Sequence, residues 1–201
     1  MTTVRKTSGR PRTFDREAAI GKATLLFWQR GYETTSMAEL TEAMGIHPPS
    51  LYSAFGDKES LFLEIVDRYI ANADQWFDGI FAREPNVRAA VVAVLAESAH
   101  NLTDPDHPPG CLLACGATNV TDSGSKVQAS LASRRQFRQD YFVEHLRQAA
   151  RRGELPANLR PETFATFLNA VIQGMSSLAR DGASKEVLLT IAATAMGGWP
   201  E

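Results

Sequence analysis

The sequence predicts an all-α fold. Through most of its 201 residues, apolar side chains recur every three or four positions, which is the spacing of one helix face. No segment shows the alternation of a half-buried strand, and glycine, proline and capping residues separate the helical segments. We expect a short arm at residues 1–13, a helix-turn-helix unit at 14–60 and a larger helical domain at 61–201.

The first helix is expected to begin after Asp15, whose carboxylate can cap free backbone amides. Ile20 and Phe27 lie on its apolar face. Arg30 then precedes Gly31, and a basic last turn followed by glycine is a typical helix end.

Two short helices follow, joined at a glycine. Ser36 and Glu39 have the spacing of a capping box, in which the Ser hydroxyl accepts from the Glu amide and the Glu side chain reaches back. Gly45 can adopt the left-handed conformation that ends a helix. Pro48 opens the second helix, because its missing amide hydrogen has no intrahelical partner there, and Gly56 follows the last residue.

The second short helix has one apolar face and one face almost free of charge. Helical spacing places Leu51, Ala54 and Phe55 inward. The opposite face consists of Pro49, Tyr52, Ser53 and Gly56. A helix, a glycine turn and a helix form the arrangement whose second helix lies in the DNA major groove. An ordinary helical hairpin is the alternative that this pattern leaves open.

Longer helices are predicted in the remainder of the chain. Asp57 caps a helix whose apolar residues extend to Ile80. A dense loop signal covers residues 101–110, and a short apolar segment follows to about Val120. The other predicted helices begin at Pro85, run from Lys126 to Arg152, begin at Pro161, and extend from Ser184 to Trp199.

The last two predicted helices, at about residues 161–199, form an antiparallel hairpin. They carry wide apolar stripes and small residues such as Gly174 and Ala192. Paired with a second copy, such a hairpin makes a four-helix dimer interface. The alternative is that the stripes face only the core of their own chain.

Residues 13 to about 70 carry motifs that are specific in combination. They are Thr13-Phe14-Asp15, Phe27-Trp28-Gln29-Arg30-Gly31-Tyr32, Thr34-Thr35-Ser36-Met37-Ala38-Glu39-Leu40, Gly45-Ile46, Ser50-Leu51-Tyr52-Ser53-Ala54-Phe55 and Lys58-Glu59-Ser60-Leu61-Phe62. Together they resemble the TetR family of bacterial transcriptional repressors. The resemblance implies a homodimer that binds a pseudo-palindromic operator in double-stranded DNA. It also implies a C-terminal domain that binds a small-molecule inducer, whose identity the resemblance leaves open.

The predicted DNA contacts lie on and beside the two short helices. In the middle of the second helix, Tyr52 and Ser53 offer hydroxyls for a phosphate and a ring for a thymine methyl. Thr35 and Ser36 lie at a helix N-terminus with free amides, which suits a phosphate. Lys58 is expected to clamp another phosphate. The remaining expected contacts, at the tip of the second helix, are His47, Pro49 and Ser50.

Positive charge is concentrated at the beginning of the chain. The formal net charge is −2, but five basic residues up to Arg16 oppose one acidic residue. Beyond residue 60 there are 13 basic and 16 acidic residues. A basic arm containing Arg10 and Arg12 can follow phosphates or enter the minor groove. A solvated tail with no defined pose is the alternative.

Cys111 and Cys115 share a helix face, with His100 and His107 upstream. Three interpretations stay open: small buried hydrophobes, a redox or electrophile sensor at Cys111, or a metal site. The sensor reading draws on a Pro-Gly-Cys-Leu-Leu run that resembles a segment of some TetR-family sensors. Because the spacing lacks a known ligand register, we predict neither a metal nor a cofactor.

The inducer pocket is expected among the helices of the C-terminal domain, because such pockets are mostly apolar with a few polar anchors. Each candidate could equally be a plain core residue. The candidate lining residues are Trp76, Phe77, Cys111, Cys115, Phe142, His145, Phe167, Gln173 and Met175.

Enzymatic activity and membrane insertion are not expected. The chain has no Gly-rich phosphate loop and no Ser/His/Asp framework, and Asp74 and Asp78, on one helix face, are expected to be solvated. No segment reaches the roughly 20 apolar residues of a membrane span. The N-terminus lacks the apolar core of a secretory signal, so a cytoplasmic location is expected.

Overall fold

The computed structural model describes residues 14–117, 121 and 124–199. All regular structure in these residues is helical, which confirms the predicted fold class. No helix within the described ranges combines the length and apolar character needed to cross a bilayer. The helices are α1 (Arg16–Arg30), α2 (Met37–Met44), α3 (Pro48–Phe55), α4 (Lys58–Arg83), α5 (Val87–Leu102), α6 (Leu112–Cys115), α7 (Ser125–Arg151), α8 (Pro161–Arg180) and α9 (Lys185–Met196).

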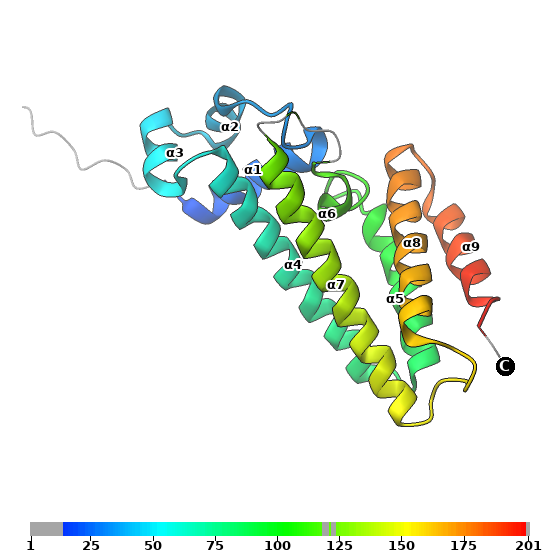
Figure 1. Cartoon of the computed structure of the whole chain (residues 1–201). Coiled ribbons are helices and arrows are strands. Elements are labelled where there is room, and N and C mark those ends of the chain that lie inside the picture. Colours follow the sequence, from blue (N-terminus) through cyan, green and yellow to red (C-terminus); the bar gives the residue numbers. More distant parts are fainter. Residues whose placement is uncertain (1–13, 118–120, 122–123, 200–201) are drawn as a thin grey trace, which may run out of the picture.

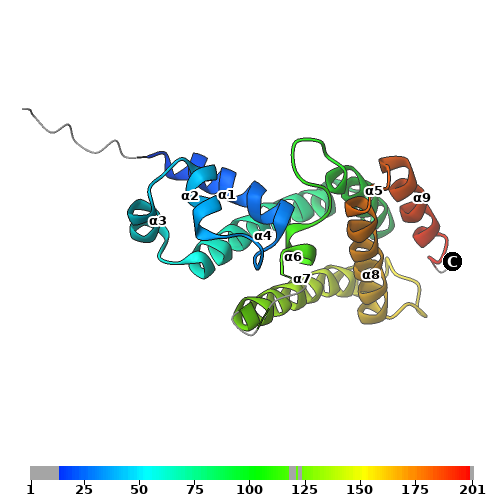
Figure 2. The same cartoon turned by 90° about the horizontal axis from the view of Figure 1, so that it is seen from above.

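The molecule is elongated, with two parts joined by α4 (Figures 1 and 2). The first three helices gather at one end and, with the first half of α4, form what we call the head. At the other end α5, α8 and α9 pack together, and α7 packs on α8. These helices, with α6 and the second half of α4, form the body.

Each part has its own hydrophobic core. Phe27, Leu40, Leu51 and Phe62 are completely buried at the centre of the head. The head core continues into α6 and the start of α7, whereas a second core fills the body between α4, α5, α7, α8 and α9. Because α4 contributes side chains to both cores, this one helix connects the head to the body. The domain boundary at residue 60 stays a prediction.

The local signals of the head form as predicted. The Asp15 carboxylate accepts from two amides of the first turn of α1, at 3.0 and 3.1 Å. Ser36 and Glu39 form the capping box of α2. Gly45 ends α2 with a φ of 71°, which is the left-handed region that glycine adopts without steric cost. The two short helices therefore have the expected bounds.

Three helix ends in the body differ from expectation. α5 begins at Val87, because the Asn86 side chain caps the Ala89 amide at 2.9 Å and Pro85 stays outside. α6 is a single turn that ends before Gly116. α9 ends at Met196, because two glycines follow it. Trp199 lies beyond the helix, with its ring 5.2 Å from that of Phe164.

Candidate nucleic-acid interface and ligand pocket

α3 holds its apolar face inward and leaves the other face free. Leu51 is completely buried and Phe55 is 6% exposed. On the opposite face Tyr52 is 53% exposed, and Pro49 and Ser53 are exposed beside it. The helix contains no charged residue. Pro49, Tyr52 and Ser53 thus form an uncharged surface, which we call the contact stripe.

The tip of α3 is also accessible. His47 is the N-cap residue, exposed and without a side-chain capping bond, and its carbonyl accepts from the Ser50 amide at 2.9 Å. Ser50 itself is half-buried. His47 is therefore the more available of these two predicted contacts.

The N-terminus of α2 is built by its capping box. The Ser36 amide donates to Glu39 Oε2 at 2.8 Å, and the Glu39 amide donates to Ser36 Oγ at 3.2 Å. The capping box does not use the next two amides, those of Met37 and Ala38, and these can meet a phosphate. Thr35 corrects our prediction: it is completely buried, and its hydroxyl donates to the Gly31 carbonyl at 2.7 Å. Its side chain stabilises the turn and is not offered to DNA.

Lys58, the predicted phosphate clamp, is half-buried at the start of α4. Its ammonium donates to the Thr35 carbonyl at 2.9 Å and lies 4.3 Å from the centroid of the Tyr32 ring. Burial lowers the pKa of this ammonium. One of its three N–H donors thus holds the start of α4 against the turn before α2, and the phosphate contact stays a prediction.

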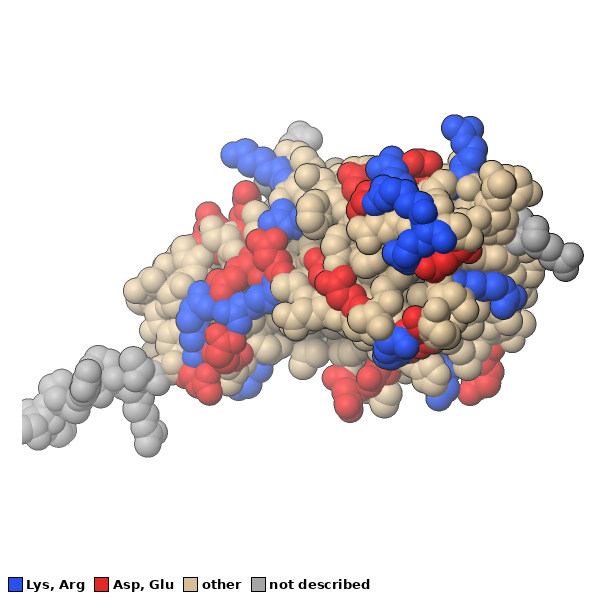
Figure 3. All heavy atoms as spheres, turned by 90° about the horizontal axis from the view of Figure 1, so that it is seen from below, with Lys and Arg blue, Asp and Glu red and all other residues tan. Residues whose placement is uncertain are grey.

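Most other cations of the described head are paired. Arg16 forms a bidentate ion pair with Glu64, with both distances 2.7 Å. Arg68 pairs with Glu17 and Glu64, and Arg30 pairs with Glu39. On the face seen in Figure 3, basic and acidic side chains are interspersed over head and body. Arg10 and Arg12, the predicted source of positive charge, lie outside the described residues.

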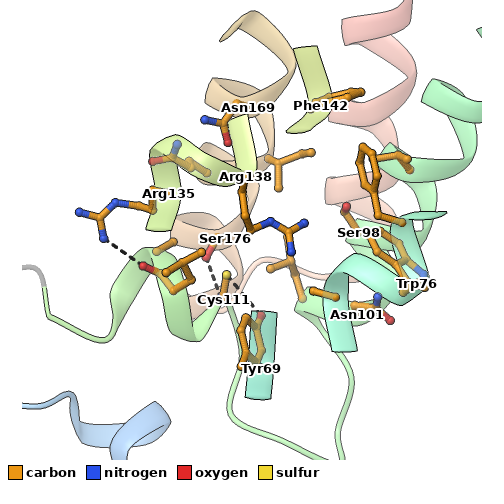
Figure 4. A pocket seen from close by; sticks show the side chains of 18 of the residues that line it. Tyr69, Trp76, Ser98, Asn101, Cys111, Arg135, Arg138, Phe142, Asn169 and Ser176 are labelled. Carbon is orange, nitrogen blue, oxygen red and sulfur yellow. Dashed lines mark hydrogen bonds between the residues drawn. The ribbon is translucent and has the colours of Figure 1, made fainter. Parts of the chain in front are cut away.

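The body contains a cavity of about 360 Å³, partly open to solvent, between α4, α5, α7, α8 and the segment that contains α6 (Figure 4). Five of the predicted lining residues are there: Trp76, Phe77, Cys111, Phe142 and Gln173. Its other described walls are Tyr69, Asn72, Ala73, Val94, Ser98, Asn101, Leu102, Leu113, Ala114, Arg135, Arg138, Gln139, Asn169, Ile172 and Ser176.

Four predicted lining residues are not in the cavity wall. Phe167 is 44% exposed on the outer side of α8, whereas Met175 is completely buried in a core next to α9. Cys115 lies next to Ser176, with 3.6 Å between Sγ and Oγ. His145 packs among aromatic side chains outside the cavity wall, and its ring centroid lies 4.4 Å from that of Phe81. Apolar character alone did not separate lining residues from core residues.

The carboxylates of Asp74 and Asp78 both meet α7. Asp78 is exposed, as expected, whereas Asp74 is half-buried, which corrects the expectation that both are solvated. Arg138 pairs with Asp74 at 3.1 Å. Asp78 accepts a hydrogen bond from Tyr141 and lies 3.4 Å from Nε2 of His145. Burial and the bond to Asp78 raise the pKa of Tyr141 to about 12. Burial lowers the pKa of His145.

The two cysteines are free thiols that meet α4 and α8. Tyr69 donates to Cys111 Sγ at 3.3 Å, and the Cys111 amide donates to Ser176 Oγ at 2.8 Å. Burial and the neighbouring thiol raise the pKa of Tyr69 well above its usual value. His107 stacks on Trp28, with centroids 4.2 Å apart. Among the described residues, no three His, Cys, Asp or Glu side chains gather as a metal site would require.

The segment from Gly110 to Gly116 connects the cavity to the head. Trp28 of α1 donates to the Gly110 carbonyl at 3.2 Å. The Tyr32 amide, just after α1, donates to the Gly116 carbonyl at 2.8 Å. Between these two anchors, Cys111 and two other residues of the segment line the cavity. The segment that lines the cavity is therefore hydrogen-bonded, at both of its ends, to residues in or next to the last part of α1.

Comparison with known proteins decides the family. The model of the tetR family of bacterial regulatory proteins matches residues 19–65. That of the tetracyclin repressor-like C-terminal domain matches residues 82–193. The chain belongs to the TetR family. It is a DNA-binding transcriptional regulator, and α2 and α3 are its helix-turn-helix.

Relatives within the TetR family cover nearly the whole chain. The HTH-type transcriptional repressor ComR of Escherichia coli is 41% identical over 98% of this chain and 95% of the relative. The repressor BdcR of the same organism is 31% identical over 93% and 90%. The structure of a CifR cysteine mutant complexed with 26bp double-strand operator DNA superposes with a TM-score of 0.90. It is 38% identical and covers 95% of this chain and 100% of that one.

In this TetR-family protein, sequence reasoning missed the polar wall of the pocket. Arg138 precedes Phe142 by four residues and Arg135 precedes it by seven, so all three share one face of α7. That spacing could have identified both arginines, once Phe142 was chosen. Ser98, Asn101 and Asn169 carried no comparable signal, because they stand among apolar residues on other helices.

Proposed function

We propose that this chain represses transcription by occupying a pseudo-palindromic operator as a homodimer and leaves it when a small molecule fills the body cavity. The contact stripe of α3 carries the proposal, because Tyr52 is exposed there on a helix otherwise anchored by Leu51. A rigid helix with a free, uncharged face suits base edges and thymine methyls in a major groove. The names of the ComR and BdcR relatives support repression.

Phosphate attraction is expected from three sources. The first amides of α2, including those of Met37 and Ala38, are oriented for an anion. His47 is accessible beside the contact stripe. The basic arm with Arg10 and Arg12 is the third source, and it stays a prediction.

A stripe on α8 supports the dimer. Phe167 and Leu178 are 44% and 41% exposed and lie three helical turns apart on one face. Gly174 lies between them, and a Cβ added there would meet nothing within 4 Å. Two copies of such a face can approach closely and bury the exposed rings and methyl groups. Dimerisation would set two α3 helices at a fixed spacing for the two halves of an operator.

Release is proposed to work through the segment from Gly110 to Gly116. A ligand in the cavity would contact Cys111 and Leu113 in this segment, while the Tyr32 amide ties it to the head. Ligand binding would favour a conformation with the two α3 helices wrongly spaced. Operator affinity would then fall by the difference in ligand affinity between the two conformations.

DNA selection followed by a salt series tests the proposal. The full chain is used to select duplexes from a random library at low salt, and affinity for the selected operator is measured as salt is raised. We expect two protomers per operator and an affinity that falls steeply with salt, because bound cations are released from the phosphates. Failure to bind any duplex at low salt would overturn the proposal.

A substitution on α8 tests the proposed dimer interface. Leu178→Glu places a charge in the proposed interface, and we expect sedimentation to show monomers that bind the operator weakly. Val92→Glu is the matched control, because Val92 is 40% exposed on α5. A Leu178→Glu protein that stays dimeric would exclude this face.

The alternative, a sensor acting through Cys111, makes a different prediction. If oxidation of this thiol were the signal, Cys111→Ser would abolish release by oxidants and spare operator binding. If cavity occupancy is the signal, Cys111→Ser retains release by small molecules. The same release assay therefore distinguishes the two.

A further inference from the structure

The cavity wall is basic on one side. Of the described residues that line it, two are arginines, Arg135 and Arg138, and none is acidic. In Figure 4 the Arg138 side chain extends across the middle of the cavity toward Asn101, whereas Arg135 points away from the centre. Arg135 donates to the Leu113 carbonyl at 3.1 Å, and no carboxylate of a described residue lies within 4.0 Å of it.

Asp74 accepts a hydrogen bond from only one of the N–H donors of Arg138. The pair has one hydrogen bond, from Nη1 to Oδ1 at 3.1 Å, whereas a guanidinium has five N–H donors. A fully engaged arginine in this molecule looks different: Arg16 holds both oxygens of Glu64 at 2.7 Å. Burial raises the pKa of Asp74 even though Arg138 opposes that rise. The guanidinium therefore keeps donors for a second anion.

The rest of the cavity suits an apolar body. Trp76, Phe77, Phe142 and Ile172 line it, and the Trp76 ring is held in place by a 2.8 Å bond from its Nε1 to Glu97. Asn72, Asn101 and Gln173 are exposed residues of the cavity wall, and none of their side-chain amides is hydrogen-bonded to a described residue. A ligand can therefore combine a flat or aliphatic body with one strongly polar end.

We infer that the cavity binds a small amphipathic carboxylic acid as its anion, with the carboxylate on Arg138 and the apolar body between Trp76, Phe77 and Phe142. A planar carboxylate matches the fork of a guanidinium and makes charge-assisted hydrogen bonds. Asp74 opposes Arg138, and Arg135 lies in the wall with its side chain directed away from the centre, so the site offers at most one uncompensated positive charge. This fits a monoanion better than a phosphate dianion. The inference deepens the proposed function, because this acid would be the releasing ligand.

Matched acids and amides provide the test. Benzoate, phenylacetate and 3-phenylpropanoate are titrated calorimetrically into the full-length protein, each alongside its primary amide and with phenyl phosphate for comparison. We expect at least one acid to bind about tenfold or more tighter than its amide, which is the typical gain from a charge-assisted hydrogen bond. The same acid should release the selected operator.

A pair of double variants locates the carboxylate. Arg138→Met with Asp74→Asn removes the cavity pair without leaving a buried charge, and we expect the acid to lose its advantage over the amide. Arg134→Met with Asp67→Asn is the control. Arg134 lies one turn earlier on α7 and pairs with Asp67 of α4 at 2.7 Å, and neither residue lines the cavity. The acid's advantage should persist in this control.

Arg138→Lys is the second variant should the double variant not fold, as judged by its melting curve. Lysine retains the positive charge but lacks the planar, two-pronged donor geometry of the guanidinium. We expect the acid to bind tighter than its amide by a smaller factor than in the wild-type protein. Three results would overturn the inference: no acid binds the wild-type protein, amides or phenyl phosphate bind as tightly as the acids, or the Arg138 variants keep the full advantage. Each of these leaves salt-dependent operator binding intact, whereas a wild-type protein that binds no duplex would instead overturn the proposed function.

Discussion

The head and the cavity differ in how far apart in sequence their residues lie. The helix-turn-helix is contained in Met37–Phe55, and each of its ends is set by a residue next to it, such as Ser36 or Gly45. The cavity is lined from Tyr69 to Ser176 by four helices and the α6 segment. Local chemistry therefore determines the DNA-reading surface, whereas long-range packing determines the ligand site. A substitution in the head should act locally, and one where the two parts meet should affect both.

The largest effect is expected at Gly110, where cavity and head meet. Its φ is +86°, and an added Cβ would lie 2.9 Å from the Ser176 carbonyl oxygen and 2.7 Å from Arg180 Cγ. Gly110→Ala should lower the free energy of unfolding by about 3 kcal/mol, from backbone strain plus overpacking. Urea denaturation measures this loss. Gly182→Ala is the control, because its φ is +93° but the space around it is open, and about 1 kcal/mol is expected. Equal losses would mean that the contact with α8 is unimportant.

Tyr52→Ala tests the contact stripe. With Tyr52 53% exposed, the substitution should leave the fold intact but lower operator affinity about tenfold, because an apolar and hydroxyl contact to the groove is lost. Binding to the selected operator at fixed salt measures it. Phe137→Ala removes another exposed ring, on α7, and should leave affinity unchanged. An affinity within about twofold of wild type would show that Tyr52 does not contact DNA.

Ser36→Ala compares a helix cap of the head with one of the body. Ser36 accepts from the Glu39 amide at 3.2 Å within a complete capping box, and its loss should cost about 1 kcal/mol of unfolding free energy. Ser184 caps α9 at 3.5 Å, so Ser184→Ala should cost less. Thermal or urea unfolding of both variants gives the order. A reversed order would contradict the view that local capping shapes the head.

The smallest effect is expected from pH, in the body. Burial lowers the pKa of His145 in the folded chain, so the unfolded chain binds more protons and stability falls as the pH drops below the unfolded value of about 6.5. His145→Gln should make the unfolding free energy less dependent on pH between about 7 and 5. His100→Gln is the control, because His100 is exposed on α5. Identical pH profiles for all three proteins would contradict the effect of burial.

Most of the head could be predicted from sequence, but two of its contacts could not. The caps of Asp15 and Ser36, the glycine turn and the bounds of α3 follow from residues within four positions of each other. Sequence position alone predicts phosphate contacts for Thr35 and Lys58. Their partners, the Gly31 and Thr35 carbonyls, are set by how α1, α2 and α4 pack. Whether a polar side chain near a helix end is exposed depends on how distant helices pack around it, and not on its neighbours in sequence.

In the cavity, the sequence identified five lining residues but could not separate them from core residues. Phe167 and Met175 lie on the same helix as Gln173, yet Phe167 faces outward and Met175 is completely buried. Helical spacing gives the angle between side chains, but it does not say which neighbour each side of the helix meets.

By itself, the sequence determined the helical fold class, the capped pair of short helices and the uncharged contact stripe, because these depend on backbone preferences and spacing over a few residues. Only the tertiary structure decided that Arg138 crosses a cavity, that Asp74 leaves it most of its donors, and that the α6 segment joins this cavity to α1. These features arise where residues distant in sequence meet, and the relative positions of packed helices are not encoded in the periodicity of any one of them.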